Sequence, residues 1–90
     1  MMTTIRHKIE PDVCTYFDEQ MNNLTVEIVL PGVSQQNIKL RVNSRCLVLF
    51  AVTGDVHYAK YLSFHFPVVA NQAIAVYGNG LLRIEMPLRA

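Results

Sequence analysis

Apolar and polar residues alternate with a period of two through much of the chain. The alternation is clearest at residues 24–30, 38–42 and 82–86, where every second side chain is apolar. Because successive side chains of a strand point to opposite faces, this pattern predicts antiparallel strands with one buried face. No segment shows a sustained helical period, and residues 34–37 predict at most one helical turn. About seven short strands at this spacing predict an all-β fold, a two-sheet antiparallel β-sandwich of the immunoglobulin-like type.

The length of the chain limits it to one domain. Ninety residues leave no room for a second core. Residues 1–10 form a short lead that we expect to be mobile, and Pro11-Asp12 opens the first predicted strand. The sandwich is therefore predicted over residues 11–87, with residues 88–90 as the C-terminal end.

A tight hairpin is predicted near the end of the chain. An apolar run at residues 74–77 is followed by Gly78-Asn79-Gly80 and then by the alternating segment 82–86. Asn and Gly supply the positive φ angles that a short reversal needs. Pro87 closes the strand ladder because it has no N–H to donate.

The hairpin also carries a motif. Residues 75–87 read Ala-x-x-x-Asn-Gly-x-Leu-x-Ile-x-x-Pro, which resembles the C-terminal signature of the α-crystallin domain of small heat-shock proteins. Further landmarks of that family follow in the same order along residues 11–87. These are Leu30-Pro31-Gly32-Val33, the strand at 37–42, Cys46-Leu47-Val48-Leu49, and Phe64-His65-Phe66-Pro67. The resemblance implies an ATP-independent holdase chaperone that binds apolar segments of unfolding client proteins and so acts in a stress response.

The resemblance implies a peptide-binding groove between two strands. In the family, such a groove accepts an Ile-x-Ile-type tail segment of a neighbouring chain, which lies along the strands and places alternate side chains in pockets. Carried over by position, the groove is lined by Ile38, Leu40 and Val42 on one side and by Ile74 and Val76 on the other. The alternative is that these five residues fill the core.

The segment at residues 46–53 breaks the alternation, because its outward positions are apolar as well. In the next predicted strand, the alternation places Leu62, Phe64 and Phe66 on the inward face. Cross-strand neighbours then place an apolar patch on the outside of the sandwich, which suits a subunit interface or a client surface. Its members are Val48, Phe50, Val52, Tyr61 and His65. The alternative is ordinary burial under a loop or under Val56 and Tyr58.

Composition argues against several other functions. The formal net charge is +1 and no basic block occurs, so no nucleic-acid partner is predicted, although folding can gather charges that look scattered. No apolar run is long enough for a membrane span, and no apolar leader is visible, which predicts a cytoplasmic protein with reduced Cys14 and Cys46. His7, His57 and His65 lack metal-ligand spacing, and no phosphate loop or nucleophile elbow is present. We therefore expect no enzyme activity, no metal and no cofactor.

Three departures from the family pattern affect assembly. Residues 54–60 are too few for the long loop that bacterial, archaeal and plant members exchange between dimer partners. Only Leu88-Arg89-Ala90 follow Pro87, and only residues 1–10 precede the first strand. We expect a monomer, or a dimer paired edge to edge or through the face of Val48, Phe50 and Val52. The alternative function is a non-chaperone interaction or adaptor module on the same sandwich, resembling the CS-domain co-chaperones.

Overall fold

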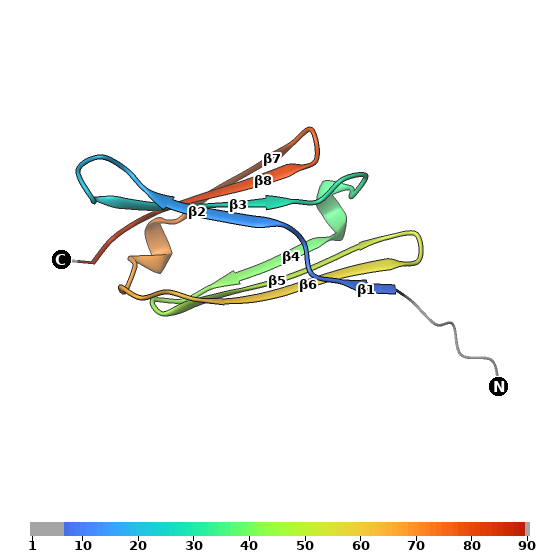
Figure 1. The fold of residues 1–90 in the computed structure, drawn as a ribbon, viewed down its shortest axis with the longest axis horizontal. Helices are drawn as coiled ribbons and strands as arrows, with labels where there is room; N and C mark the ends of the chain where they lie inside the picture. The colour runs from blue at the N-terminus through green and yellow to red at the C-terminus, as the bar shows by residue number, and fades with distance from the viewer. Residues whose placement is uncertain (1–6, 90) are drawn as a thin grey trace.

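The computed structural model describes residues 7–89 as two stacked four-stranded sheets (Figure 1). Sheet A has the strand order β1-β6-β5-β4, and sheet B has the order β2-β3-β8-β7. The strands are β1 (His7–Ile9), β2 (Val13–Phe17), β3 (Asn23–Val29), β4 (Ile38–Val42), β5 (Cys46–Thr53), β6 (Val56–Ser63), β7 (Ile74–Gly78) and β8 (Leu81–Pro87). Two 3₁₀ turns, η1 (Gln35–Asn37) and η2 (Ala70–Gln72), are the helical elements of the described part. The predicted all-β sandwich is confirmed.

The structure has one strand more than the sequence predicts. The additional strand is β1, which pairs in parallel with β6 from His7↔Val56 to Ile9↔Tyr58. It falls within residues 1–10, the short lead that we expected to be mobile, and no strand was predicted there. Three residues are too few to show a period of two. Their partner strand lies some fifty positions further along the chain, so the sequence around β1 does not indicate the pairing. The expectation for residues 1–6 lies outside the described residues.

The core forms where the apolar faces of the two sheets meet. In sheet B, β3 and β8 pair Leu24 with Met86, Val26 with Ile84, and Ile28 with Leu82, and all six side chains are buried. In sheet A, β5 contributes buried residues at every second position (Leu47, Leu49 and Ala51). Removing such side chains from water supplies roughly 25 cal/mol per Å² of apolar surface and is the main force that holds the two sheets together.

Two of the sequence landmarks meet at one corner of the sandwich. The Tyr77 hydroxyl lies 2.8 Å from the carbonyl oxygen of Leu30 and 2.6 Å from that of Val33, and the Leu30 N–H donates to the Gly80 carbonyl at 2.7 Å. A Cβ on Gly80 would lie 3.3 Å from the Cα of Pro31. The β7–β8 hairpin is thus anchored to the turn that follows β3.

The β7–β8 turn has the geometry that its sequence predicts. Asn79 and Gly80 have φ angles of 52° and 76°, as both central residues of a type I′ turn require. Gly78 does not share the positive φ that we expected for it, because it is the last residue of β7 and pairs with Leu81. The β5–β6 reversal has the same length and uses Gly54 at a φ of 53°.

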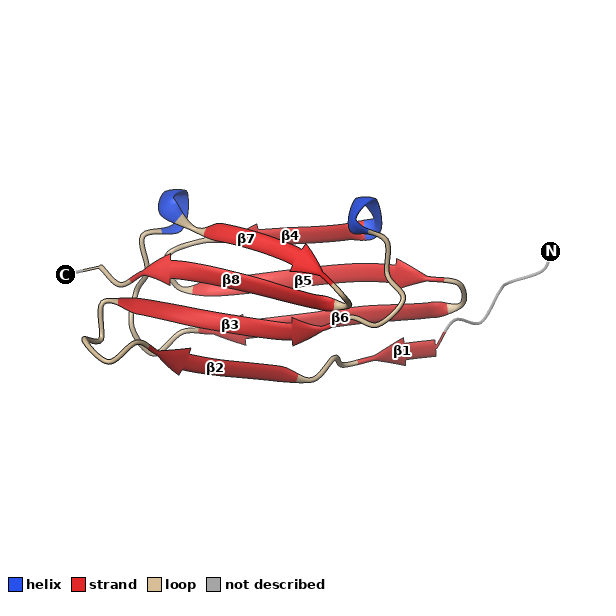
Figure 2. Ribbon diagram, turned by 90° about the horizontal axis from the view of Figure 1, so that it is seen from above, coloured by secondary structure: helices blue, strands red, loops and turns tan. Residues whose placement is uncertain are grey.

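Each sheet has two edge strands, and these lie on two sides of the sandwich. Figure 2 shows β4 and β7 along one side and β1 and β2 along the other. Edge strands present unpaired backbone N–H and C=O groups to a partner strand. Both sides of the sandwich are therefore open to pairing with an extended segment, independently of what binds the faces.

Candidate partner-binding surfaces

The outward face of sheet A carries large apolar side chains. On β5, Val48, Phe50 and Val52 alternate with the buried Leu47, Leu49 and Ala51, so they point away from the core. Tyr61 of β6 lies directly opposite Val48 in the antiparallel register. Phe50 is 56 % exposed and Tyr61 is 63 % exposed, whereas Val48 and Val52 are half-buried. These four residues, hereafter the β5–β6 patch, form one continuous apolar surface.

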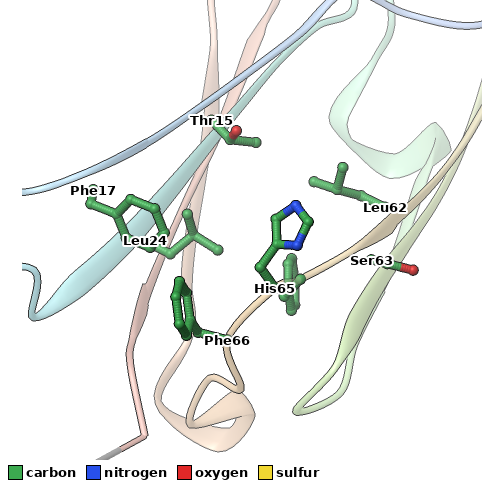
Figure 3. A pocket seen from close by; sticks show the side chains of 8 residues that line it. Thr15, Phe17, Leu24, Leu62, Ser63, His65 and Phe66 are labelled. Atoms are coloured by element: carbon green, nitrogen blue, oxygen red, sulfur yellow. The ribbon is translucent and has the colours of Figure 1, made fainter.

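His65, the fifth residue predicted for this patch, lies elsewhere. It follows the end of β6 and lines a cavity of about 160 Å³ between the sheets, with residues of β2, β3 and β6 (Figure 3). Phe66, predicted to point inward, is 54 % exposed and makes an edge-to-face contact with Phe17 at 6.1 Å between ring centroids. The alternation ends here because β6 stops at Ser63, so it no longer decides where His65 and Phe66 point.

The remaining lining of this cavity was not predicted from the sequence. Besides His65 and the two phenylalanines in edge-to-face contact, it consists of Thr15, Leu24, Leu62, Ser63 and Phe64. The residues of β2 and β3 are hairpin neighbours, and the stacking of the two sheets brings them against residues 62–66, far away in the chain. The available signal was the inward face predicted for the next strand, whose Leu62 and Phe64 line the cavity.

The predicted groove residues fall on two different surfaces. Ile38, Leu40 and Val42 pair with the inward positions of β5 and pack, partly buried, against the core. Ile74 and Val76 pair with Glu85 and Arg83, which places them on the outward face of sheet B, where they are 66 % and 64 % exposed.

The two predicted sides of the groove therefore do not face each other. The cavity beside β4 is lined by Leu40, Arg41, Val42, Asn43, Cys46 and Val48, without a contribution from β7. Strands β4 and β7 are both sheet edges on the same side of the sandwich (Figure 2). An extended segment can therefore pair with either edge.

Two surface carboxylates have lowered pKa values. The pKa of Glu10 is lowered mainly by a hydrogen bond from Lys60, whose Nζ lies 2.9 Å from Oε1. The pKa of Asp18 is lowered first by a hydrogen bond from the side chain of Asn23 and then by backbone N–H groups of the β2–β3 turn, of which Asn22 N lies 2.7 Å from Oδ1. In both cases hydrogen-bond donors stabilise the ionised carboxylate and so lower its pKa.

Other chemical features of the described part are few. Within residues 7–89, no group of three or more His, Cys, Asp or Glu side chains is arranged to hold a metal ion. Over the same residues, no helix is sufficiently long and apolar to cross a membrane. Cys14 is exposed, Cys46 is half-buried, and both are free thiols. The β5–β6 patch and the sheet edges are thus the features of this part that suit binding.

Solved structures with the same fold are small heat-shock proteins. No protein-family model matches the sequence, and no curated protein matches it either. Heat shock protein 16.0 from Schizosaccharomyces pombe is similar with a TM-score of 0.75 and 16 % identity, over 89 % of this chain and 87 % of that one. A small heat-shock protein from Xylella fastidiosa gives 0.74 and 17 %, over 89 % and 86 %. HSP18.5 from E. histolytica gives 0.76 and 10 %, over 91 % and 90 %.

These similarities concern the fold. At such low identities the structures agree in strand order and packing rather than in side chains. The chain therefore has the sandwich of small heat-shock proteins, as its motifs predicted. Its activity has to be argued from its own surface.

Proposed function

We propose that the protein is a small heat-shock-type chaperone that holds unfolding proteins without ATP. The observation that carries this proposal is the β5–β6 patch, where Phe50 and Tyr61 stand more than half exposed on a sheet face next to Val48 and Val52. Contiguous exposed apolar side chains of this kind mark interaction sites on soluble proteins. On a sandwich with this fold, the partner that best suits the patch is an exposed apolar segment of an unfolding client.

The mechanism needs binding only. Covering a large apolar side chain completely is worth about 1.5–3 kcal/mol, and Phe50 and Tyr61 start partly buried. Association itself costs roughly 4–15 kcal/mol in lost freedom of motion. One patch therefore holds a client weakly and reversibly, and several copies on one client hold it much more firmly. The proposal includes no catalytic step, no metal and no cofactor.

The sheet edges provide the second mode of binding in this proposal. An extended segment that pairs with β4 or β7 gains main-chain hydrogen bonds, as in β-strand addition. Ile74 and Val76 stand exposed beside the β7 edge to meet its side chains. We retain here the predicted binding of an Ile-x-Ile-type tail from another chain. A dimer through an edge or through the β5–β6 patch also belongs to the proposal, and light scattering coupled to size exclusion measures it.

The first experiment measures heat-induced light scattering of an unrelated protein without ATP, at increasing ratios of this protein. We expect protection at near-equimolar amounts. Phe50→Ser and Tyr61→Ser should reduce protection while leaving the melting temperature nearly unchanged, because both side chains are exposed. Val29→Ser is the control, since it removes an exposed apolar side chain of β3 from the outward face of the opposite sheet, and Ile74→Ser tests the β7 edge.

The outcomes separate the alternatives. Loss of protection with Ile74→Ser alone would move client binding to the β7 edge. No protection by the folded wild-type protein would refute the holdase and favour an adaptor module. We also retain the cytoplasm as the predicted location, and fractionation of cells that produce the tagged protein tests it.

A further inference from the structure

Basic side chains that look scattered in the sequence gather around the β5–β6 patch. On β4, Lys39 pairs with Phe50 and Arg41 pairs with Val48, so both point outward from sheet A beside the apolar residues. Lys39 and Phe50 line the same surface hollow, and Arg41 and Val48 line another. Across the sheet, Lys8 of β1 takes an outward position opposite His57. Two exposed cations thus flank the patch along β4, and Lys8 adds a third on the other side, beyond His57 at the Val52 end.

Acidic side chains do not balance these cations at the strand positions of this face. In the described part of β1, β4, β5 and β6, the outward positions are occupied by Lys8, Lys39, Arg41, Cys46, Val48, Phe50, Val52, His57, Ala59, Tyr61 and Ser63. One carboxylate at the rim, Glu10, lines a hollow with Phe50 and Tyr61, but it is paired with Lys60 at 2.9 Å. Asp55 lies apart, in the turn between β5 and β6.

The opposite face of the sandwich has a different charge pattern. On the outward side of sheet B, Arg83 lies 3.3 Å from Glu85 and 4.0 Å from Glu27. Its cation is therefore shared between two carboxylates, and this face carries no excess of positive charge. The combination of exposed aromatic side chains with uncompensated cations distinguishes the outward face of sheet A.

We propose that this face selects apolar client segments that are flanked by Asp and Glu. The inference rests on the proposed holdase function and specifies its clients. The apolar residues of the segment cover the β5–β6 patch, and its carboxylates lie near Lys39, Arg41 and Lys8. Segments flanked by Lys and Arg meet like charges instead and bind more weakly.

The partner that fits this face is a peptide rather than a nucleic acid. The face offers three exposed cations, fewer than the roughly 6–10 phosphate contacts typical of nucleic-acid binders. Aliphatic residues lie between and beside the aromatic rings of this face. Such a surface suits the aliphatic side chains of a client better than stacked bases.

The test compares fluorescently labelled peptides that share one apolar centre and differ in their flanks. One carries Asp and Glu, one carries Lys and Arg, and one carries Ser. In anisotropy titrations at about 50 mM NaCl, we expect the acidic peptide to bind about tenfold more tightly than the basic one. The ratio should fall to about twofold near 0.5 M NaCl, where charges are screened over a few ångströms.

Charge-reversal variants locate the effect. Lys39→Glu combined with Arg41→Glu should invert the preference, because both cations flank the patch directly. Arg89→Glu reverses one exposed cation after β8, which is half the charge change of the double variant, and should leave the preference as it is. Lys39→Gln with Arg41→Gln should reduce the preference to the contribution of Lys8, and it serves as the milder variant if the reversed protein melts early.

Three results overturn the inference. Equal affinity for acidic and basic peptides refutes the selection and leaves the holdase proposal standing if client protection is intact. No binding of any peptide, together with no client protection, refutes the holdase proposal as well. Binding of a single-stranded oligonucleotide more tightly than the acidic peptide assigns the face to nucleic acid instead.

Discussion

Tyr77→Phe removes one oxygen atom from the corner where the β7–β8 hairpin meets the turn after β3. The hydroxyl has a single proton, and two carbonyl oxygens lie within hydrogen-bond distance, Leu30 at 2.8 Å and Val33 at 2.6 Å. The ring of the substituted residue stays in place against the core. The perturbation is therefore confined to hydrogen bonding and leaves no large cavity.

The expected magnitude follows from these contacts. A typical intramolecular hydrogen bond contributes about 0.5–1.5 kcal/mol net, and a buried acceptor left without a donor adds a further penalty. Leu30 keeps one longer contact, from the Val33 N–H at 3.4 Å, which limits that penalty. We therefore expect a loss of about 1–2 kcal/mol in the free energy of unfolding. In a domain of this size, this corresponds to a melting temperature lower by roughly 5–15 °C.

Thermal unfolding followed by circular dichroism measures the effect, and the chain supplies its own control. Tyr16→Phe also removes a phenolic hydroxyl, but this one donates to Glu27 at 3.1 Å on the exposed face of sheet B. We expect its melting temperature to stay within the error of the measurement, because water replaces the lost partner. A Tyr77→Phe protein as stable as the wild type would show that the corner does not depend on this hydroxyl. Equal losses in both variants would refute the reasoning from burial.

Three further predictions concern stability. Leu82→Ala should lower the free energy of unfolding by about 2–5 kcal/mol because it leaves a cavity in the core. Leu81→Ala, on the outward face, should lower it far less. Equal unfolding midpoints of the two variants in urea would contradict the assigned faces. Gly80→Ala should cost about 1–3 kcal/mol and more than Gly54→Ala, because both have positive φ but only Gly80 lies against backbone. Asp18→Ala should lower the melting temperature at neutral pH and change it little at about pH 2. The pKa of this carboxyl is lowered in the folded protein, so its ionised form adds stability above the pKa of the unfolded state, and this stability is lost as the pH falls. A difference in melting temperature that stays constant from pH 7 to about pH 2 would exclude the ionised form as the cause.

The parts of the fold that the sequence predicts are those with local causes. Alternation placed the strands around Leu24 and Leu82 with the correct inward faces, because a polar opposite face leaves a single choice of buried side. The turn at Asn79-Gly80 was equally predictable, since its backbone angles admit few other residues. These signals depend only on neighbours in the chain.

The parts that were missed depend on contacts between distant segments. Strand β1 is defined by its pairing with β6, and the position of His65 is defined by the end of β6 and the stacking of the sheets. The groove prediction set Ile74 and Val76 opposite the β4 side of the groove by analogy, yet the type I′ turn fixes the β7–β8 register and turns both onto the outward face of sheet B. Tyr77 and Ala75 take the inward positions instead.

Stability and binding depend on different residues of the same strand. On β5, the inward Leu47, Leu49 and Ala51 satisfy the alternation and hold the sandwich together, and the outward apolar residues gain little by folding because water still reaches them. A strand that served only the fold would carry polar side chains at Val48 and Phe50, as β4 does at Lys39 and Arg41. Folding therefore does not require the outward apolar residues of β5, whereas β4 keeps the regular alternation with basic residues at its outward positions. Substitutions at the outward positions of β5 should separate client protection from the melting temperature, whereas substitutions at the inward positions should lower both together.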